Sequence, residues 1–203
     1  MTGKRHSFGD GLMAFYSDIE KDYVPRYRQW HNCEHIPERV SIPGFIEGRR
    51  YHGCEGASDF LMTYETDTAE VLESKAYLGA LDKPTEWTRE ALTHFRKPRR
   101  GIYRLLSAYG ESDFFTAPWL LSIRLDGGEI TSQGAEAVLE DIQNRGAPSA
   151  RFYGINDHIA RIVTTEKKIY GEGVPYRRHL ILIEHKGAGE RKDILENRRK
   201  GAL

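Results

Sequence analysis

The sequence predicts an α+β fold built from two ferredoxin-like units in tandem, on three observations. In the first half, strand-like apolar runs and amphipathic segments follow one another in the order β-α-β-β-α-β. The second half opens in a similar order. The phrase Arg50-Tyr51-His52-Gly53 is echoed by Arg151-Phe152-Tyr153-Gly154. We therefore expect a first unit over residues 1–110 and a degenerate second unit over residues 111–203.

The elements expected in the first half follow from apolar spacing and from turn and cap residues. Apolar and aromatic positions from Ile19 onward recur at helical spacing, and Pro43-Gly44 is typical of a tight turn into a strand. Thr68 and Thr85 are each suited to cap a helix. The expected elements are strands at 12–16, 45–52, 60–65 and 102–109, and helices from 19 to about 38, 68–78 and 85–95.

The second half repeats this pattern incompletely. The expected elements are strands at 119–125, 150–155 and 179–184, and helices at 132–145 and 189–200. Residues 158–176 have no counterpart in the first half, and we expect them to form a hairpin or an arm. The second half lacks counterparts of the last strand and of the histidine motif described below. We therefore expect the chemistry in the first unit alone.

Composition excludes several classes of function. Lys and Arg together number 30, as do Asp and Glu, so no net charge favours a nucleic acid or a membrane surface as partner. The basic cluster at 96–100 lacks interleaved aromatic residues and is interpreted as the solvated start of a strand. Two cysteines, Cys33 and Cys54, are too few for a disulfide framework, which favours the cytoplasm. No apolar stretch approaches a membrane span, and residues 1–11 lack a signal-peptide pattern and are expected to form a loose arm.

The strongest functional signal is the run Tyr27-Arg28-Gln29-Trp30-His31-Asn32-Cys33-Glu34-His35-Ile36-Pro37-Glu38-Arg39. On a regular helix Glu34 falls in the middle of the aromatic stripe, His31 lies at its margin and His35 lies further round. Burial raises the pKa of a carboxyl unless a cation pairs with it. Glu34 is therefore either an acid–base group beside histidines or the partner of an arginine such as Arg49 or Arg50.

This region resembles the EthD-like group of the dimeric α+β-barrel superfamily. The resemblance rests on Trp30-His31-x-x-Glu34-His35-Ile36-Pro37-Glu38-Arg39, then Ile42-Pro43-Gly44-Phe45 and Arg49-Arg50-Tyr51. It covers residues 1–110 well and the second half only as a degenerate repeat. It implies antiparallel sheets packed as an α+β barrel, with sites between sheet and helices. It also implies a homodimer, unless the tandem repeat builds the barrel within one chain. The superfamily includes cofactor-free monooxygenases, isomerases, cyclases, haem-degrading enzymes and chlorite dismutases, so the fold does not select a reaction.

Two rival interpretations involve a metal or haem. His31-Asn32-Cys33-Glu34-His35 also matches the inverted zinc-protease pattern H-x-x-E-H, but such enzymes need a third ligand from another helix and a larger cleft. A different metal site could combine both histidines of this motif with a carboxylate or His52. His94 or His179 could serve as a haem ligand. His94 and His179 have no distinguishing context, and His31 and His35 have suitable spacing for a metal but no compelling third ligand. We therefore expect no metal and no cofactor, and His52 keeps the metal alternative open.

We expect a small-molecule enzyme that uses cofactor-independent proton transfer on an aromatic or carbonyl-containing metabolite. Its type would be isomerase, or lyase in the form of a dehydratase, cyclase or decarboxylase. The alternatives are a cofactor-free monooxygenase, a metal-dependent enzyme that uses His31 and His35, and a non-catalytic binding protein. A homodimer is the one protein partner that we expect, with no nucleic acid and no membrane.

The predicted site residues come from the same motif and its neighbours. Glu34 or His31 would act as the acid–base group, His35 as a second donor, and Arg50 as the partner of an anionic group or developing oxyanion. Aromatic side chains would supply the walls of the site. These predicted wall residues are Tyr27, Trp30, Tyr64 and Trp87.

Overall fold

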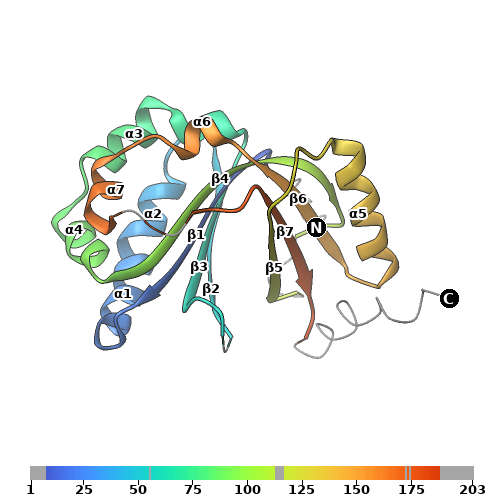
Figure 1. Cartoon of the computed structure of the whole chain (residues 1–203). Helices are drawn as coiled ribbons and strands as arrows, with labels where there is room; N and C mark the ends of the chain where they lie inside the picture. The colour runs from blue at the N-terminus through green and yellow to red at the C-terminus, as the bar shows by residue number, and fades with distance from the viewer. Residues whose placement is uncertain (1–7, 55, 113–116, 172, 174, 188–203) are drawn as a thin grey trace, which may run out of the picture. The chain divides into compact units, whose positions relative to one another are not determined.

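The chain divides into two compact units in the computed structural model, which describes residues 8–54, 56–112, 117–171, 173 and 175–187 (Figure 1). The motif unit comprises residues 9–104 and 155–176, and it contains the histidine motif. The repeat unit comprises residues 1–8, 105–154 and 177–203. The segment 155–176 therefore belongs to the first compact unit, although it lies late in the chain.

The motif unit contains an antiparallel sheet with the strand order β2-β3-β1-β4. Its strands are β1 (Gly11–Ile19), β2 (Phe45–His52), β3 (Phe60–Thr66) and β4 (Phe95–Tyr109). The strand β4 starts seven residues before the predicted position, at Phe95 rather than Ile102, because the basic cluster itself pairs with β1. A bulge interrupts this pairing between Tyr16 and Asp18, and Lys97 opposite it has a φ of 49°.

Four consecutive helical segments follow β1 and match the single helix predicted there. They are η1 (Lys21–Tyr23), α1 (Val24–Trp30), η2 (His31–His35) and α2 (Ile36–Val40). Pro25 stands in the first turn of α1, where its missing N–H costs nothing. The predicted Pro43-Gly44 turn into β2 is confirmed, since Gly44 has a φ of +90° that suits glycine.

The predicted helix at 68–78 is wrong as a single element. A short 3₁₀ segment, η3 (Ala69–Glu73), precedes a separate helix, α3 (Lys75–Asp82), whose cap is Ser74 rather than Thr68. Ser74 has extended backbone angles, and its hydroxyl accepts the N–H of Tyr77, so the helix restarts there. The cap predicted at Thr85 is confirmed, because its hydroxyl accepts the N–H of Thr88 at the start of α4 (Glu86–Thr93).

The segment predicted as a hairpin or arm instead forms two short helices of the motif unit. They are α6 (Asp157–Ala160) and α7 (Thr165–Tyr170), capped by Asn156 and Thr164. The helix α7 packs against α3 and α4 (Figure 1). Two polar caps and several apolar residues at helical spacing favour helices over a ribbon here.

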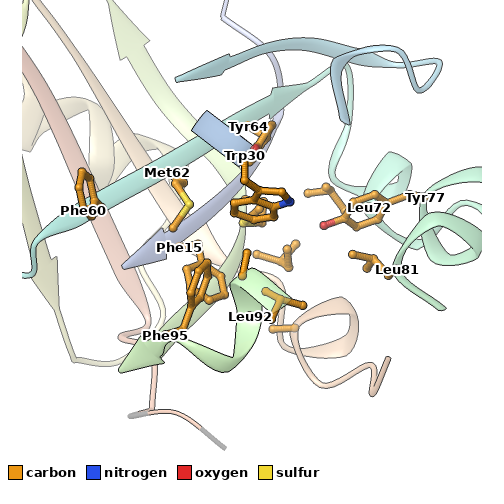
Figure 2. Close-up of a cluster of buried hydrophobic side chains, with 14 of the residues drawn as sticks. Phe15, Trp30, Phe60, Met62, Tyr64, Leu72, Tyr77, Leu81, Leu92 and Phe95 are labelled. Carbon is orange, nitrogen blue, oxygen red and sulfur yellow. The ribbon is translucent and has the colours of Figure 1, made fainter. Parts of the chain in front are cut away.

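The core of the motif unit lies between its sheet and its helices. Figure 2 shows Trp30 among the side chains of the strands and of α3 and α4. Trp30 is fully buried, and Phe15 and Phe95 pack edge to face with ring centroids 5.5 Å apart. The large apolar members of this core include Met13, Phe15, Phe60, Met62, Leu72, Leu81, Leu92, Phe95 and Ile102.

The repeat unit has the strand order β4-β6-β7-β5, with its part of β4 beginning at Leu105. Its other elements are β5 (Trp119–Leu125), α5 (Ser132–Asn144), β6 (Ser149–Ile155) and β7 (His179–His185). These agree with the predicted positions. The helix α5 packs on Phe152, Ile181 and Ile183. The helix predicted at 189–200 and most of the predicted N-terminal arm lie outside the described residues.

The predicted fold class is confirmed as α+β with tandem ferredoxin-like sheets. Both units place helices on an antiparallel sheet, and every strand pairing described between residues 11 and 185 is antiparallel. Within the described part of the chain, we find no helix with the length and apolar character needed to cross a membrane.

Candidate functional site

The histidine motif occupies a π turn. The backbone N–H of Ile36 donates to the carbonyl oxygen of His31, an i→i+5 bond that takes up one more residue than an α turn. As a result four side chains, spaced four residues apart, all face the core and are buried. They are Tyr27, His31, His35 and Arg39. A regular α-helix would have turned His35 away, as the sequence-based prediction assumed.

His31 is a neutral histidine at the centre of the core. It has no exposed surface, and burial lowers its pKa to about 3, with smaller contributions from the positive charges of Arg50 and Arg39. Its Nε2 lies 3.3 Å from the hydroxyl of Tyr64 on β3. Its Nδ1 is buried and has no hydrogen-bond partner among the described residues.

His35 is also buried and neutral. Burial, followed by the charge of Arg39, holds its pKa well below the usual range. Its ring stacks obliquely on Trp30, with centroids 4.4 Å apart, and lies 5.6 Å from the ring of His31. Its Nδ1 is a second buried nitrogen with no hydrogen-bond partner in the described part of the chain. A neutral imidazole of this kind can donate or accept a proton towards a bound molecule.

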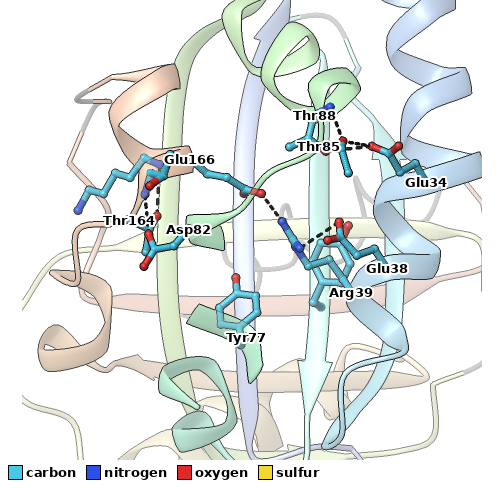
Figure 3. A network of polar contacts seen from close by, with 12 residues as sticks. Glu34, Glu38, Arg39, Tyr77, Asp82, Thr85, Thr88, Thr164 and Glu166 are labelled. Carbon is cyan, nitrogen blue, oxygen red and sulfur yellow. Dashed lines mark hydrogen bonds and ion pairs between the residues drawn. The ribbon is translucent and has the colours of Figure 1, made fainter. Parts of the chain in front are cut away.

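The structure corrects the prediction that an arginine pairs with Glu34. Its Oε1 accepts hydrogen bonds from the hydroxyls of Thr85 at 2.7 Å and Thr88 at 3.1 Å (Figure 3). Thr88 in turn accepts the indole N–H of Trp30 at 3.1 Å. The π turn moves Glu34 off the aromatic stripe to a half-buried position beside the start of α4. Arg49 instead pairs with Glu47, and Arg50 lies over the ring of Tyr27.

A buried ion pair stands one turn further along the helix. Arg39 on α2 is 1% exposed and pairs with Glu166 of α7, which is 6% exposed (Figure 3). Glu38 lies 3.2 Å from the other terminal nitrogen of Arg39. Burial raises the pKa of the Glu166 carboxyl, although the charge of Arg39 opposes the shift. Glu166 is therefore a carboxylate that accepts a proton more readily than one in water.

A pocket in the motif unit gathers this ion pair, His35 and an aromatic wall. Its water-accessible volume is about 30 Å³, which is enough for roughly two water molecules. Its polar lining comes from the histidine motif, the strands and α7. The lining residues are Met13, Phe15, Trp30, His35, Arg39, Met62, Tyr64, Tyr77, Leu81, Leu92, Phe95, Arg100, Thr164, Glu166 and Tyr170.

Three of the predicted site residues meet in this pocket: His35, Trp30 and Tyr64. His31 stands behind it and reaches it through the hydroxyl of Tyr64. Tyr64 itself is fully buried, and burial holds its pKa well above the usual range. Tyr64 thus contacts both histidines of the motif, His31 through its hydroxyl and His35 through an edge-on ring contact with centroids 6.2 Å apart.

The other predicted site residues lie outside the lining of this pocket. Arg50 lies over the ring of Tyr27, with its Cζ 5.8 Å from the ring centroid. Burial lowers the pKa of Arg50, and its Nη1 has no hydrogen-bond partner among the residues that the structure describes. Tyr27 packs on Phe60. Trp87 lies under Arg26 near the surface.

The residues considered for metal or haem make local contacts instead. His94 stacks on Tyr23 and pairs with Glu20, and His179 bonds the carbonyl oxygen of Gly128 at 2.8 Å. His52 is exposed and packs edge-on to Phe60. In the described ranges no three His, Cys, Asp or Glu side chains come close enough together to hold a metal ion.

Sequence reasoning missed Arg39, Glu166, Arg100 and Tyr77. Arg39 had a usable signal, because it continues the four-residue interval from Tyr27 through His31 and His35. Glu166 had none, since it lies 127 residues from Arg39 in the sequence. Only the folding of α7 onto the motif unit brings the two together.

Comparisons with known proteins bear on the fold. No family model matches the sequence, and no curated protein matches it. A protein of Fusobacterium nucleatum subsp. nucleatum named "putative monooxygenase" is similar in structure, with a TM-score of 0.54 at 7% identity, over 94% of this chain and 82% of that chain. A mutant chlorite dismutase from Candidatus Nitrospira defluvii in complex with cyanide gives 0.51 at 11% identity, over 96% of this chain and 84% of that chain. At these identities the likeness concerns the fold, and it confirms a ferredoxin-like α+β architecture.

Proposed function

We propose that this protein is an EthD-like small-molecule enzyme that moves a proton at a carbon next to a carbonyl group, without a cofactor. The observation that carries the proposal is the pocket in which a neutral histidine, a buried carboxylate and two arginines face one another among aromatic side chains. Pairs of titratable groups whose surroundings push their pKa values in opposite directions are typical of acid–base sites.

Glu166 is the general base of this proposal. Its pKa is raised by burial, which increases the basicity of the carboxylate. The carboxylate takes the proton from the carbon, and the electron pair of the broken C–H bond forms the double bond of an enolate. Arg39, in contact with Glu166, keeps the carboxylate in place and charged before the substrate arrives.

His35 is the electrophile. Its lowered pKa keeps the imidazole neutral at pH 7, so it retains an N–H that can be donated to the oxyanion of the enolate. The protonated Glu166 then returns the proton to the same carbon, which gives exchange, or to a neighbouring atom of the substrate, which completes an isomerisation. In an elimination Glu166 instead gives the proton to the leaving group as its bond to carbon breaks, and the electron pair of the enolate forms the new double bond. Trp30 and Tyr64 supply apolar walls that exclude water.

The test is solvent deuterium exchange followed by proton NMR in D₂O. Acetate, pyruvate, phenylpyruvate and acetoacetate, with the methyl esters of the first three, are incubated with the protein, and loss of the C–H signal is measured. We expect exchange by the wild type and a loss of about 10²-fold or more in Glu166→Gln, as for removal of a general base. The rate should rise with pH through the raised pKa of Glu166.

The control is Glu140→Gln, because Glu140 is an exposed carboxylate of α5 in the repeat unit. Equal exchange in Glu166→Gln and Glu140→Gln would contradict the role of Glu166. Glu34→Gln belongs in the same series, since the sequence predicted an acid–base role there. A loss of about 10²-fold confined to Glu34→Gln would assign the base to Glu34 instead.

Cofactor-free oxygenation is the second candidate, and the structural likeness to the Fusobacterium protein favours it. Both reactions begin by taking a proton from carbon, so the same residues would serve the first step. An oxygen electrode separates them. Oxygen uptake that requires both the protein and one of these carbonyl compounds would support oxygenation, whereas exchange without uptake supports the isomerase or lyase.

A further inference from the structure

We propose that the substrate carries a carboxylate, which is held in the pocket by Arg100 of β4 together with Arg39. This inference rests on the proposed function, and it adds the chemical class of the substrate. It assigns Arg100, a residue of the basic cluster that the sequence placed at a solvated strand start, to the interior of the site.

The two cations of the pocket differ in their ion pairs. Arg39 has two carboxylate partners, Glu166 and Glu38, and Arg100 has none among the described residues. Arg39 and Arg100 are the two cations of the lining, and Glu166 is its one carboxylate. Arg39 and Glu166 contact each other directly, whereas Arg100 donates to the neutral hydroxyl of Tyr77 at 3.4 Å. Nearby Tyr77, Tyr170 and the charge of Glu166 favour the ionised guanidinium of Arg100, but no carboxylate of the described residues contacts it directly. A bound carboxylate would supply that direct partner.

Two residues of the pocket lining carry buried nitrogens without a hydrogen-bond partner among the described residues. Nη1 of Arg39 and Nδ1 of His35 are buried and have no hydrogen-bond partner in the described part of the chain, although Glu38 lies 3.2 Å from that Nη1 without the geometry of a hydrogen bond. A carboxylate has two oxygens that can accept several such bonds at once, and arginine is the side chain best shaped to supply them.

A second hollow in the motif unit provides the remaining room. Arg100 and Tyr170 line both the pocket and this hollow. The water-accessible volume of the hollow is about 190 Å³. Lys167 also lines the hollow, and its lining contains no acidic residue among those described. A positively charged approach favours anions over neutral carbonyl compounds.

Tyr170 lines both spaces, as Arg100 does. It ends α7 and packs edge-on to Phe15, with ring centroids 5.2 Å apart. A turn of its ring would join the pocket to the hollow, so a substrate would enter with its carboxylate beside Arg100. When the carboxylate also reaches Arg39, it replaces Glu166 as the partner of that guanidinium. Glu166 is then free to act as the base.

The experiment measures binding rather than turnover. Acetate, pyruvate and phenylpyruvate are each compared with their methyl esters by saturation-transfer NMR titration of the whole protein. The wild type should bind at least one carboxylate about 10-fold or more tightly than its ester, which corresponds to about 1.4 kcal/mol. Arg100→Gln should weaken the binding of that carboxylate by about 10-fold and leave the affinity for the ester unchanged.

The matched control is Arg104→Gln, because Arg104 lies on the same strand, is 55% exposed and pairs with Glu70. Arg100→Lys keeps the charge without the forked donors and should fall between wild type and Arg100→Gln. Equal binding of every acid and its ester by the wild type would overturn the proposal, whether or not any variant folds. Equal losses in Arg100→Gln and Arg104→Gln would overturn it as well.

Failure of this inference is distinct from failure of the proposed reaction. If the esters exchange deuterium but the acids do not bind better, the reaction stands and the carboxylate class is wrong. If carboxylates bind through Arg100 and no compound exchanges deuterium, the binding site stands and the reaction is wrong.

Discussion

His31 and His35 show how burial of a single side chain links folding to pH. In the unfolded chain a histidine takes up a proton near pH 6.5, whereas the folded pKa of His31 is about 3 and that of His35 is also lowered. The unfolded state therefore binds more protons below pH 6.5. We expect the free energy of unfolding to be highest above this pH. It should fall as the pH drops, by about 1.4 kcal/mol per pH unit for each histidine.

Urea unfolding at a series of pH values checks this expectation. His31→Gln should reduce the slope of the unfolding free energy between pH 6.5 and the folded pKa, because one of the two buried imidazoles is gone. His158→Gln is the control, since His158 is 82% exposed. An unchanged slope in His31→Gln would show that folding does not lower the pKa of His31.

Thr85 combines two roles that can be separated by mutation. Its hydroxyl caps α4 and donates to Glu34. Thr85→Ala should lower the free energy of unfolding by about 2 kcal/mol or more, of which about 1 kcal/mol is the cap. Thr131→Ala should cost only the cap, because Thr131 caps α5 by accepting the N–H of Gly134.

A double-mutant cycle isolates the bond between Thr85 and Glu34. We expect Thr85→Ala and Glu34→Ala together to cost less than the sum of the two, with a coupling energy of about 0.5 kcal/mol or more. Simple additivity would mean that the hydrogen bond contributes nothing to stability. These measurements use chemical unfolding and need no substrate.

At the scale of elements, the π turn explains why helical periodicity misplaced Glu34. The extra residue in η2 lets Tyr27 and His35 share a face although they are eight residues apart. Asn32 is exposed, and its deletion would reduce the separation of Tyr27 and His35 to seven residues, which is about two turns of a regular α-helix. We therefore expect the deletion variant to fold, with a loss of at most about 1–2 kcal/mol.

Deletion of Glu136 from α5 is the matched control. Glu136 is also exposed, but α5 has no extra residue, so the deletion would turn Leu139 and Ile142 out of the core by about 100°. The cost should be several kcal/mol, at about 2–5 kcal/mol for each large apolar side chain removed. Similar melting temperatures for the two deletion variants would contradict the π-turn interpretation.

For the whole molecule, we expect the purified protein to carry no stoichiometric transition metal. His31 and His35 are close, but a catalytic zinc site needs about three protein ligands, and none of the described His, Cys, Asp or Glu side chains completes such a group. Elemental analysis checks the metal content. One equivalent of metal in the wild type, lost in His31→Ala, would establish a metal site.

The homodimer implied by the resemblance stays a prediction. The tandem sheets of one chain supply two ferredoxin-like units, so a single chain already holds the elements that a single-domain relative would obtain from a partner. Light scattering on the purified protein measures its mass directly. A mass of one chain would contradict the homodimer, and a mass of two chains would support it.

Local patterns in the sequence determined most of the secondary structure and the fold class. The strand at β2, the cap at Thr85 and the helix α5 lie where apolar spacing and cap residues predicted them. These features depend on neighbours within a few residues, and the sequence shows such neighbours directly. The motif that the sequence singled out has both histidines buried, with His35 against the ring of Trp30, and its role as the functional site stays a prediction.

Tertiary structure alone decided which polar groups meet. Arg39 and Glu166 are far apart in the sequence, and no local pattern predicts that α7 folds onto α3 and α4. The π turn likewise depends on what each face of the helix buries, since it exchanges an ideal hydrogen-bond pattern for the burial of His35 and Arg39. Contacts between distant segments follow from packing of the whole core, and packing is not encoded in the spacing of any one segment.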